Sequence, residues 1–175
     1  MLIRAFREAD REVVDRLLAE AFSGPQPDGS PAASPPIEVG LNSALCASAE
    51  FIPELALVAL ADEAVAGYCI TTRAWVGDAP ALGLGPIGVD PSVQGGGIGS
   101  ALVRETLRLA AGRGERVVAL LGDPVYYGRF GFVPSTELGI VAPEPAWGAY
   151  FQAVRLDEAE APVGAFRYAT PFTEL

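Results

Sequence analysis

A run of glycines near the middle of the chain is the feature most able to do chemistry. The glycine loop, Gln94-Gly95-Gly96-Gly97-Ile98-Gly99, follows an apolar run that ends at Val89 and precedes a helical pattern that begins at Ser100. Glycine allows a backbone to approach a ligand closely, and the free amides and the dipole of a helix start attract negative oxygen atoms. The loop therefore predicts a binding site for a diphosphate group.

The spacing of the glycines limits which diphosphate carrier fits. The dinucleotide pattern Gly-x-Gly-x-x-Gly fails, because Ser100 or Leu102 stands where the third glycine is needed. The phosphate loop of nucleoside triphosphatases requires a lysine, and the chain has none. A different nucleotide binder that uses the same loop stays open as an alternative.

The pattern that remains is Gln-x-x-Gly-x-Gly. It is formed by Gln94, Gly97 and Gly99, after a strand that ends in Val89-Asp90-Pro91. In these residues the chain resembles the GNAT superfamily of N-acetyltransferases, whose signature has this form. We therefore expect the fold of that superfamily.

A second match lies downstream, in residues 122–132. It resembles the Tyr-x-x-x-Gly-Phe element that closes the cofactor site of GNAT proteins, and the tyrosine of that element is Tyr127. The run Tyr-Tyr-x-Arg-Phe-Gly-Phe is especially similar to a bacterial branch of the superfamily, the YhbS-like proteins. The resemblance thus spans nearly the whole chain.

The resemblance implies acetyl-CoA as cosubstrate, without a metal, and direct transfer of its acetyl group to a primary amine in a ternary complex. The Tyr127 phenol has an ordinary pKa of about 10 and would donate a hydrogen bond or proton to a departing thiolate, whose conjugate acid has a pKa of about 8.5. Tyr127 is therefore predicted to be catalytic. The predicted cofactor-binding residues are Ile87, Val89, Gln94, Gly95, Gly96, Gly97, Ile98, Gly99 and Ser100.

The strand before the loop is interrupted by Gly85 and Pro86. Proline removes a donor from the ladder, so a bulge or a splayed edge is expected there. In GNAT folds the central strands part to admit the pantetheine arm. By analogy, Ile87 and Val89 would offer it backbone groups, and the Val89 amide would polarise the thioester carbonyl. An edge strand broken for packing reasons is the alternative.

The general base is not identified by the sequence. Many GNAT proteins place an acidic residue on the strand before the loop, but Gly83, Gly85 and Gly88 stand there instead. A water relay or a carboxylate such as Glu50, Glu54 or Asp78 would then deprotonate the acceptor.

Two other residues near Tyr127 are given no part in the reaction. Asp123 precedes a proline, and we expect it to cap a helix. Arg129 is assigned no role.

The elements that must position these residues follow from apolar spacing and from glycine and proline punctuation. The order predicts an α/β protein with a mixed sheet, β-α-α-β-β-β-α-β-α-β-β, with splayed central strands, in a single domain over residues 1–175. Asp10 is expected to cap the first helix, and Gly112 to end the third. The expected helices cover residues 10–22, 37–49, 100–111 and a short segment from 124 to 130, and the expected strands cover 3–6, 55–60, 64–72, 82–89, 116–121 and two C-terminal runs. The loop of residues 23–36 is expected to wall the acceptor site.

Composition narrows the partners. The chain has 175 residues, 12 arginines against 22 acidic residues, and a net charge of −10, which repels phosphate backbones and anionic lipid. Neither nucleic acid nor a membrane is expected as a partner, and a cytoplasmic location is expected. Histidine is absent, which excludes a Ser-His-Asp triad and a histidine metal site, and Cys46 and Cys69 are expected to be reduced thiols.

Two further questions stay open at this stage. A non-catalytic acyl-CoA sensor or interaction module would keep the glycine loop and lack a base, as this chain does. A homodimer is possible through the C-terminal strands, where Trp147, Tyr150 and Phe151 could supply apolar contacts.

Overall fold

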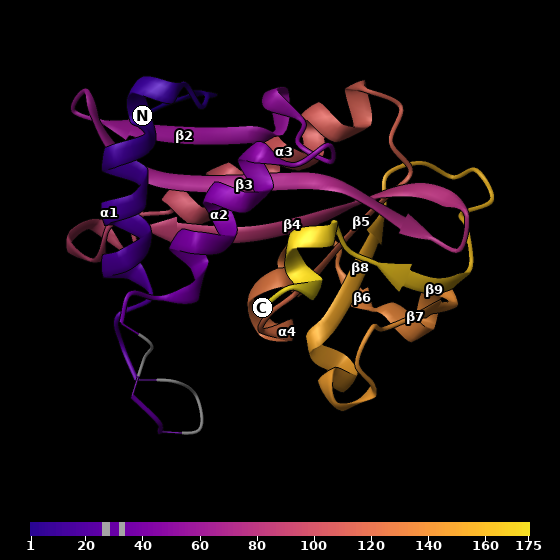
Figure 1. Ribbon diagram of the computed structural model, residues 1–175. Coiled ribbons are helices and arrows are strands. Elements are labelled where there is room, and N and C mark those ends of the chain that lie inside the picture. The colour runs from indigo at the N-terminus through magenta and orange to yellow at the C-terminus, as the bar shows by residue number, and fades with distance from the viewer. Residues whose placement is uncertain (26–28, 32–33) are drawn as a thin grey trace.

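A single mixed sheet forms the frame of the molecule in the computed structural model, which describes residues 1–25, 29–31 and 34–175. Helices α1 and α2 lie in front of strands β2, β3 and β4 in Figure 1, and α3 lies behind them. The helices are α1 Arg11–Ala21, α2 Ile37–Ala47, α3 Ile98–Gly112 and α4 Pro124–Tyr127. The strands are β1 Leu2–Ala5, β2 Ala56–Ala61, β3 Ala64–Val76, β4 Ala79–Val89, β5 Val117–Leu121, β6 Val133–Pro134, β7 Ile140–Val141, β8 Phe151–Arg155 and β9 Gly164–Arg167.

The sheet changes character at its centre. Its path runs β1-β2-β3-β4-β5-β8-β6, with β9 paired to the far end of β3 and to β7. Neighbours along the path are antiparallel except β4 and β5, which are parallel and joined by the crossover through α3. Among the described residues β4 pairs with β5 at Leu82 and Gly83 alone. After Gly83, β4 therefore separates from β5. The predicted splay of the central strands is confirmed.

The predicted order of elements is confirmed, with β6 and β7 as additional two-residue strands. α3 ends at Gly112, as predicted, but two predicted helix caps are wrong. Gly112 belongs to α3, and the glycine with a left-handed backbone is Gly114, at φ +78°. The Asp10 side chain does not cap α1, because its carboxylate binds the Arg4 guanidinium at 2.7 and 2.8 Å and the Arg7 amide at 2.8 Å. Within the 23–36 loop, residues 26–28 and 32–33 lie outside the described residues.

Two apolar clusters fill the spaces between the sheet and its helices. On one face, Val14 and Leu18 of α1 and Leu45 of α2 pack against Tyr68 and Ile70 of β3. On the other face, α3 packs its apolar stripe against β2, β3 and β4; the buried residues of that stripe are Ile98, Leu102, Val103 and Ala110. Full burial of one such side chain contributes about 1.5 to 3 kcal/mol to folding.

Glycines on the sheet set how closely the helices approach it. A Cβ on Gly67 of β3 would lie 2.6 Å from Ile98 and 3.0 Å from Leu102, both on α3. A Cβ on Gly88 of β4 would lie 3.1 Å from Leu17 and 3.2 Å from Leu18, both on α1. Because Gly67 and Gly88 have no side chain, α3 and α1 can pack closely against opposite faces of the sheet.

Both cysteines are free, and Cys69 is fully buried. Burial raises the pKa of Cys46, and it raises the pKa of Cys69 to about 12, so both thiols are weak nucleophiles at neutral pH.

Phe151 is buried in the C-terminal aromatic cluster with Phe166 and Tyr168, so the expectation that it supplies a dimer contact is wrong. None of the helices in the described ranges has the length and apolar content needed to span a bilayer.

Candidate functional site

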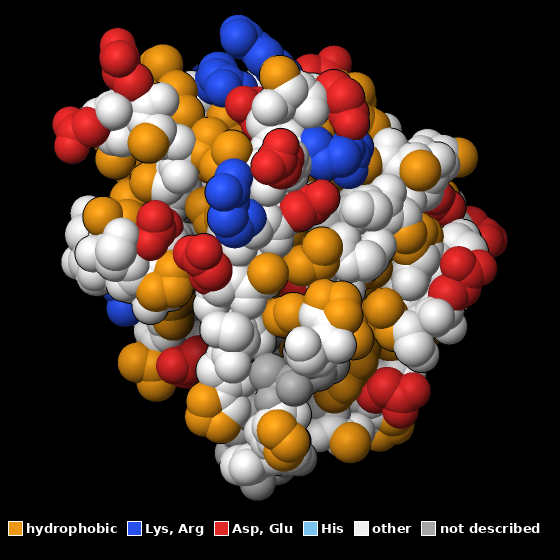
Figure 2. All heavy atoms as spheres, turned by 60° about the vertical axis from the view of Figure 1, so that its left-hand side comes forward, with side chains coloured by type: hydrophobic (Ala, Val, Ile, Leu, Met, Phe, Trp, Pro, Cys, Tyr) orange, Lys and Arg blue, Asp and Glu red, His pale blue; other side chains and the backbone are white. Residues whose placement is uncertain are grey.

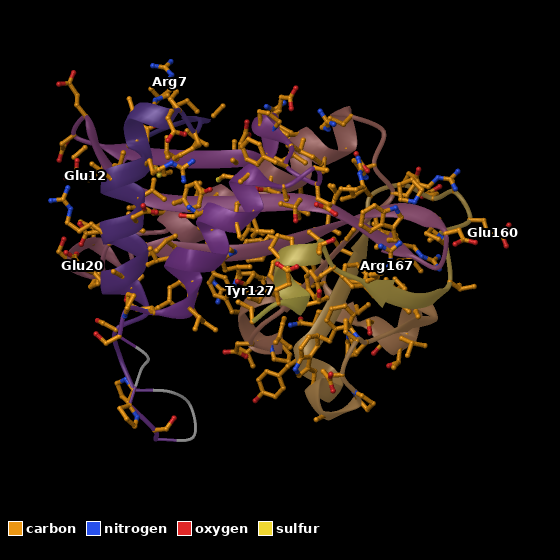
Figure 3. The ribbon with its side chains drawn as sticks, in the orientation of Figure 1. Arg7, Glu12, Glu20, Tyr127, Glu160 and Arg167 are labelled. Atoms are coloured by element: carbon orange, nitrogen blue, oxygen red, sulfur yellow. The ribbon has the colours of Figure 1, made fainter. Side chains whose placement is uncertain are left out.

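A cavity of about 420 Å³ opens where β4 leaves β5 and α3 begins. Figure 3 places Tyr127 in the middle of the molecule, and Tyr127 is one wall of this cavity. The other lining residues come from the end of α1, from β4, from the glycine loop and from the segment after β5. They are Ala21, Phe22, Ile87, Gly88, Val89, Gln94, Gly95, Gly97, Ile98, Gly99, Ser100, Tyr126 and Arg129.

The edge of β4 that faces the cavity carries backbone groups without a strand partner. The Asp90 amide donates to the Ala66 carbonyl of β3 at 2.9 Å. Backbone groups alternate in direction along an antiparallel strand, so the amides of Ile87 and Val89 point to the opposite edge, away from β3. The pairing with β5 has ended at Gly83, so this edge is free to pair with an extended ligand.

The turn into the glycine loop is held by its own side chains. The Asp90 carboxylate accepts hydrogen bonds from the Ser92 amide at 2.8 Å and from the Ser92 hydroxyl at 2.7 Å. Gln94 donates from Nε2 to the Val89 carbonyl at 3.1 Å. This glutamine therefore occupies the last carbonyl of β4 and links the strand to the loop.

The loop delivers a helix start to the cavity. Gly97 precedes α3 with a left-handed backbone at φ +85°, and the first helical hydrogen bond runs from the Ala101 amide to the Gly97 carbonyl. The amides of Ile98, Gly99 and Ser100 precede that bond, so they have no acceptor inside the helix. Three donors and the positive end of a 15-residue helix thus meet at the cavity.

Eight of the nine predicted cofactor-binding residues line this cavity, and Gly96 is the exception. A Cβ on Gly96 would lie 3.3 Å from the Val93 carbonyl oxygen, so this glycine faces its own loop. The sequence could not predict that Gly96 faces away from the cavity, because the direction of each loop residue depends on the backbone conformation of the loop.

The segment after β5 holds Tyr127 in place. Asp123 caps α4, as expected, by accepting a hydrogen bond from the Val125 amide at 2.8 Å. Gly122 leaves room for the Tyr127 ring, since a Cβ there would lie 2.3 Å from that ring. The ring is 9% exposed and makes edge contacts with Tyr126 and Phe132. Burial, together with Cys69 and Tyr126, raises the pKa of the Tyr127 phenol, which therefore stays protonated.

Arg129 and Tyr126 also line the cavity, although the sequence-based predictions place neither residue in the site. Arg129 places its guanidinium 4.7 Å from the centre of the Tyr126 ring and is the one charged side chain among the residues that line the cavity. The Tyr126 hydroxyl lies 3.5 Å from that of Ser100, at a point where a Cβ on Gly99 would come within 2.9 Å. Tyr126 and Arg129 are three residues apart across α4 and the 3-10 turn that follows it, and this spacing was the signal that could have paired them.

The three carboxylates considered as bases lie elsewhere. Glu50 accepts a hydrogen bond from the Thr170 hydroxyl at 3.2 Å, and Glu54 lies 3.5 Å from Arg113. Asp78 lies in the turn between β3 and β4, and none of the three lines the cavity.

The glycines that replace an acidic residue on β4 have packing functions. A Cβ on Gly83 would lie 2.8 Å from the Tyr168 ring, and Gly88 lies beneath α1. Gly85 has a backbone φ of +134°, which favours glycine. A carboxylate at Gly83 or Gly88 would therefore displace a packed neighbour, and one at Gly85 would strain the backbone.

The family of the chain follows from its sequence over the segment that builds this cavity. The sequence model of a family described as the acetyltransferase (GNAT) family matches residues 14–132, more than half of the chain. The chain belongs to the GNAT family. The resemblance drawn from the glycine loop and from Tyr127 is confirmed.

Curated GNAT relatives match part of the chain. The uncharacterized N-acetyltransferase YjhQ of Escherichia coli is 33% identical over 113 residues, which cover 62% of this chain and 62% of YjhQ. The uncharacterized N-acetyltransferase YhbS of E. coli is 35% identical over 105 residues, which cover 58% of this chain and 63% of YhbS. The matches thus span less than two thirds of either relative.

Solved GNAT structures match over nearly the whole chain. E. coli YhbS in complex with CoA superposes with a TM-score of 0.85 at 29% identity, covering 98% of this chain and 91% of that one. A GNAT acetyltransferase from Brucella melitensis in complex with acetyl-CoA has a TM-score of 0.76 at 31% identity and covers 98% and 97%. The GNAT fold predicted for this chain is confirmed.

Proposed function

We propose that this chain is an N-acetyltransferase that binds acetyl-CoA in the cavity beside β4 and transfers the acetyl group directly to a primary amine. The observation that carries this proposal is the free edge of β4, where Ile87 and Val89 point away from β3 and lead to the start of α3. An extended amide-bearing arm and a diphosphate fit this succession of groups.

The residues present fit such a cosubstrate. The amides of Ile98, Gly99 and Ser100 would bind the diphosphate oxygens, and Arg129 would add the one positive side chain of the cavity. The amides of Ile87 and Val89 would pair with the pantetheine arm as an added strand does. Bound CoA in YhbS and bound acetyl-CoA in the Brucella protein support this assignment.

The same residues suit the chemistry of transfer. Acetyl-CoA would supply a thioester, whose carbonyl carbon an amine can attack. Of the two β4 amides, that of Ile87 lies farther from the diphosphate donors and lines the cavity on the far side of Tyr127, so it, in place of the Val89 amide expected from the resemblance, would hold the thioester oxygen as negative charge develops there. The Tyr127 phenol, kept protonated by burial, would donate a hydrogen bond to the departing sulfur.

Binding of the cosubstrate can be tested with two matched glycine variants. Gly97 and Gly114 both have left-handed backbones, at φ +85° and +78°, and a Cβ at either position would meet no atom within 4 Å. Alanine should therefore strain both positions equally, by about 1 to 2 kcal/mol. Gly97→Ala alone should weaken acetyl-CoA binding, measured by calorimetry, because Gly114 lies at the other end of α3.

Ligand choice and turnover complete this test. Acetyl-CoA and CoA, but not NAD or ATP, should stabilise the wild type, by about 2.7 kcal/mol at a hundred times the Kd. Release of free thiol in the presence of amines should then follow. Absence of binding to both CoA forms would refute the site, while binding without thiol release from any amine would favour a sensor over an enzyme.

A further inference from the structure

Two cavities continue beyond Tyr127, on the side away from the glycine loop. The nearer one has a volume of about 410 Å³ and shares Phe22, Ile87 and Tyr127 with the cavity beside β4. The farther one has a volume of about 560 Å³. It shares five wall residues with the nearer one, namely Glu38, Leu41, Leu121, Tyr168 and Phe172. A ligand that reaches Tyr127 from this side therefore passes the wall formed by α2 and the C-terminal segment.

Two carboxylates on this path, those of Glu38 and of the exposed Glu144, make no hydrogen bond or ion pair within the described ranges, and Glu38 is the one that lines both cavities. Glu38 lies in the first turn of α2 and is half-buried. Asp123 also lines the nearer cavity, but its carboxylate caps α4. Arg167 lines the farther cavity and places its guanidinium 4.2 Å from the centre of the Trp75 ring. Glu38 is thus the uncompensated charge nearest to Tyr127 in the wall.

The hydroxyl group of a largely buried tyrosine ring lies on the same path. Tyr168 is 8% exposed and lines both cavities, and its hydroxyl has no hydrogen-bond partner in the described part of the chain. Burial raises the pKa of this phenol, so the hydroxyl stays neutral. This hydroxyl is therefore available to a polar group of a ligand that enters either cavity.

The farther cavity is mainly apolar. Its charged lining residues are Glu38, Glu144 and Arg167, and the charge of Arg167 opposes the other two. The remaining side chains of its wall, apart from the Thr173 hydroxyl, are apolar or aromatic: Ile37, Leu41, Leu121, Pro143, Trp147, Phe166, Tyr168, Phe172 and Leu175. A polyamine, which needs several carboxylates, fits this wall poorly, and an aryl or branched alkyl group fits it well.

We propose that Glu38 binds the ammonium group of the acceptor and that the farther cavity holds an apolar group of the same molecule, so that the acceptor is a primary amine carried on an aryl or branched alkyl group. This inference rests on the proposed acetyl transfer. Glu38 acts on the choice of substrate. The bound ammonium would lose one proton to water before its nitrogen attacks, the C–N bond would form as the C–S bond breaks, and Tyr127 would act on the departing sulfur. Trp147, which packs against Phe151 and Tyr168, is one of the four aromatic side chains that line the farther cavity and would contact the apolar group.

Steady-state kinetics at saturating acetyl-CoA tests the carboxylate. Glu38→Gln should raise the KM for phenethylamine and tryptamine at least tenfold, with the KM for acetyl-CoA changed less than twofold, and Glu38→Asp should recover part of the loss. Glu12→Gln is the control, because the Glu12 side chain is 93% exposed and projects from α1 away from the cavities (Figure 3). Melting temperatures of all variants identify any loss of folding.

The apolar cavity is tested by the choice of amine and of acyl donor. Wild type should prefer phenethylamine and tryptamine to ethylamine and spermidine at least tenfold, and Trp147→Ala should reduce that preference. Calorimetry with CoA-saturated protein measures binding of the same amines without turnover. Equal use or equal binding of spermidine, unchanged kinetics in Glu38→Gln, or no binding of any aryl amine would overturn the inference.

A further outcome separates this inference from the proposed function. If hexanoyl-CoA is a better donor than acetyl-CoA and Trp147→Ala removes that advantage, the farther cavity holds the acyl chain and the inference fails while the enzyme remains. If neither CoA form binds, the proposed function itself fails.

Discussion

Tyr127 depends on its neighbours for both its place and its protonation state. Gly122 leaves the space that the ring occupies, and the rings of Tyr126 and Phe132 contact it edge-on. Removal from water favours the neutral phenol and raises its pKa. The residue is therefore prepared to donate a hydrogen bond over the whole neutral and mildly alkaline range.

Replacement of this phenol is the first prediction at the residue scale. Tyr127→Phe should lower kcat roughly a hundredfold, which is within the usual range for a lost proton or hydrogen-bond donor, while the KM for acetyl-CoA changes little. Tyr150→Phe is the matched control, since Tyr150 is 59% exposed and lies outside the three cavities. Equal kcat in wild type and Tyr127→Phe at every pH would remove Tyr127 from the mechanism.

The raised pKa of Tyr127 also predicts a pH profile. A phenol of ordinary pKa would lose its proton near pH 10. Burial raises the pKa above that value, so kcat of the wild type should show no fall from ionisation of Tyr127 below pH 10. A pH–rate profile measured to pH 10 checks this, and a decline that is present in wild type but absent in Tyr127→Phe would contradict it.

At the scale of elements, the approach of α3 to the sheet decides where its amides lie. Gly67 allows Ile98 and Leu102 to pack directly on β3, and Ile98 is the first residue of the helix. The packing contact and the diphosphate donors are thus in the same turn of α3. A change in the distance between helix and sheet would move the donors.

Gly67→Ala should therefore affect folding and binding together. The added methyl group would lie 2.6 Å from Ile98, and overpacking of this kind costs about 1 to 3 kcal/mol. Acetyl-CoA affinity should fall as well, because the start of α3 shifts. In the control, Gly112→Ala, a Cβ in the last turn of α3 meets nothing within 4 Å, so stability should be kept or slightly increased. Urea unfolding and calorimetry measure the two effects, and intact affinity in Gly67→Ala would contradict this view.

At the scale of the whole molecule, arginine–carboxylate pairs join separate elements, across 42 positions of sequence in one case and six in the other. Arg73 of β3 binds Glu115, just before β5, at 2.7 Å through both guanidinium nitrogens. Arg4 of edge strand β1 binds Asp10, which precedes α1. On the face that carries α1, by contrast, acidic and arginine side chains are interspersed at the surface (Figure 2), where ion pairs contribute little.

The pair of Arg4 and Asp10 predicts how stability depends on pH. The Arg4 hydrogen bonds lower the pKa of Asp10, so the pair contributes fully above the unfolded carboxyl pKa of about 3.9, and this contribution is lost as the pH falls through the lowered pKa. Asp10→Asn should cost about 1 to 3 kcal/mol at pH 7. The difference from wild type should shrink below pH 4. Urea unfolding at both pH values checks this, with Glu12→Gln as a control that changes stability by less than about 0.5 kcal/mol.

The local features of this protein are set by residues that are neighbours in the chain. The glycine loop before α3, the cap at Asp123 and the position of Tyr127 after β5 were all predictable, because caps, turns and helix starts depend on short stretches of sequence. The order of strands and helices followed from apolar spacing for the same reason.

Contacts between distant segments were decided only by the tertiary structure. Nothing near Glu115 shows that its carboxylate binds Arg73, and nothing near Gly83 shows that Tyr168 lies over it. The carboxylate of Glu38 lines the same cavity as Tyr127, although the two residues are 89 positions apart in the chain (127 − 38). Such pairs depend on which face of the sheet each helix covers. Residues far apart in the sequence come into contact only when the helices have packed on the sheet.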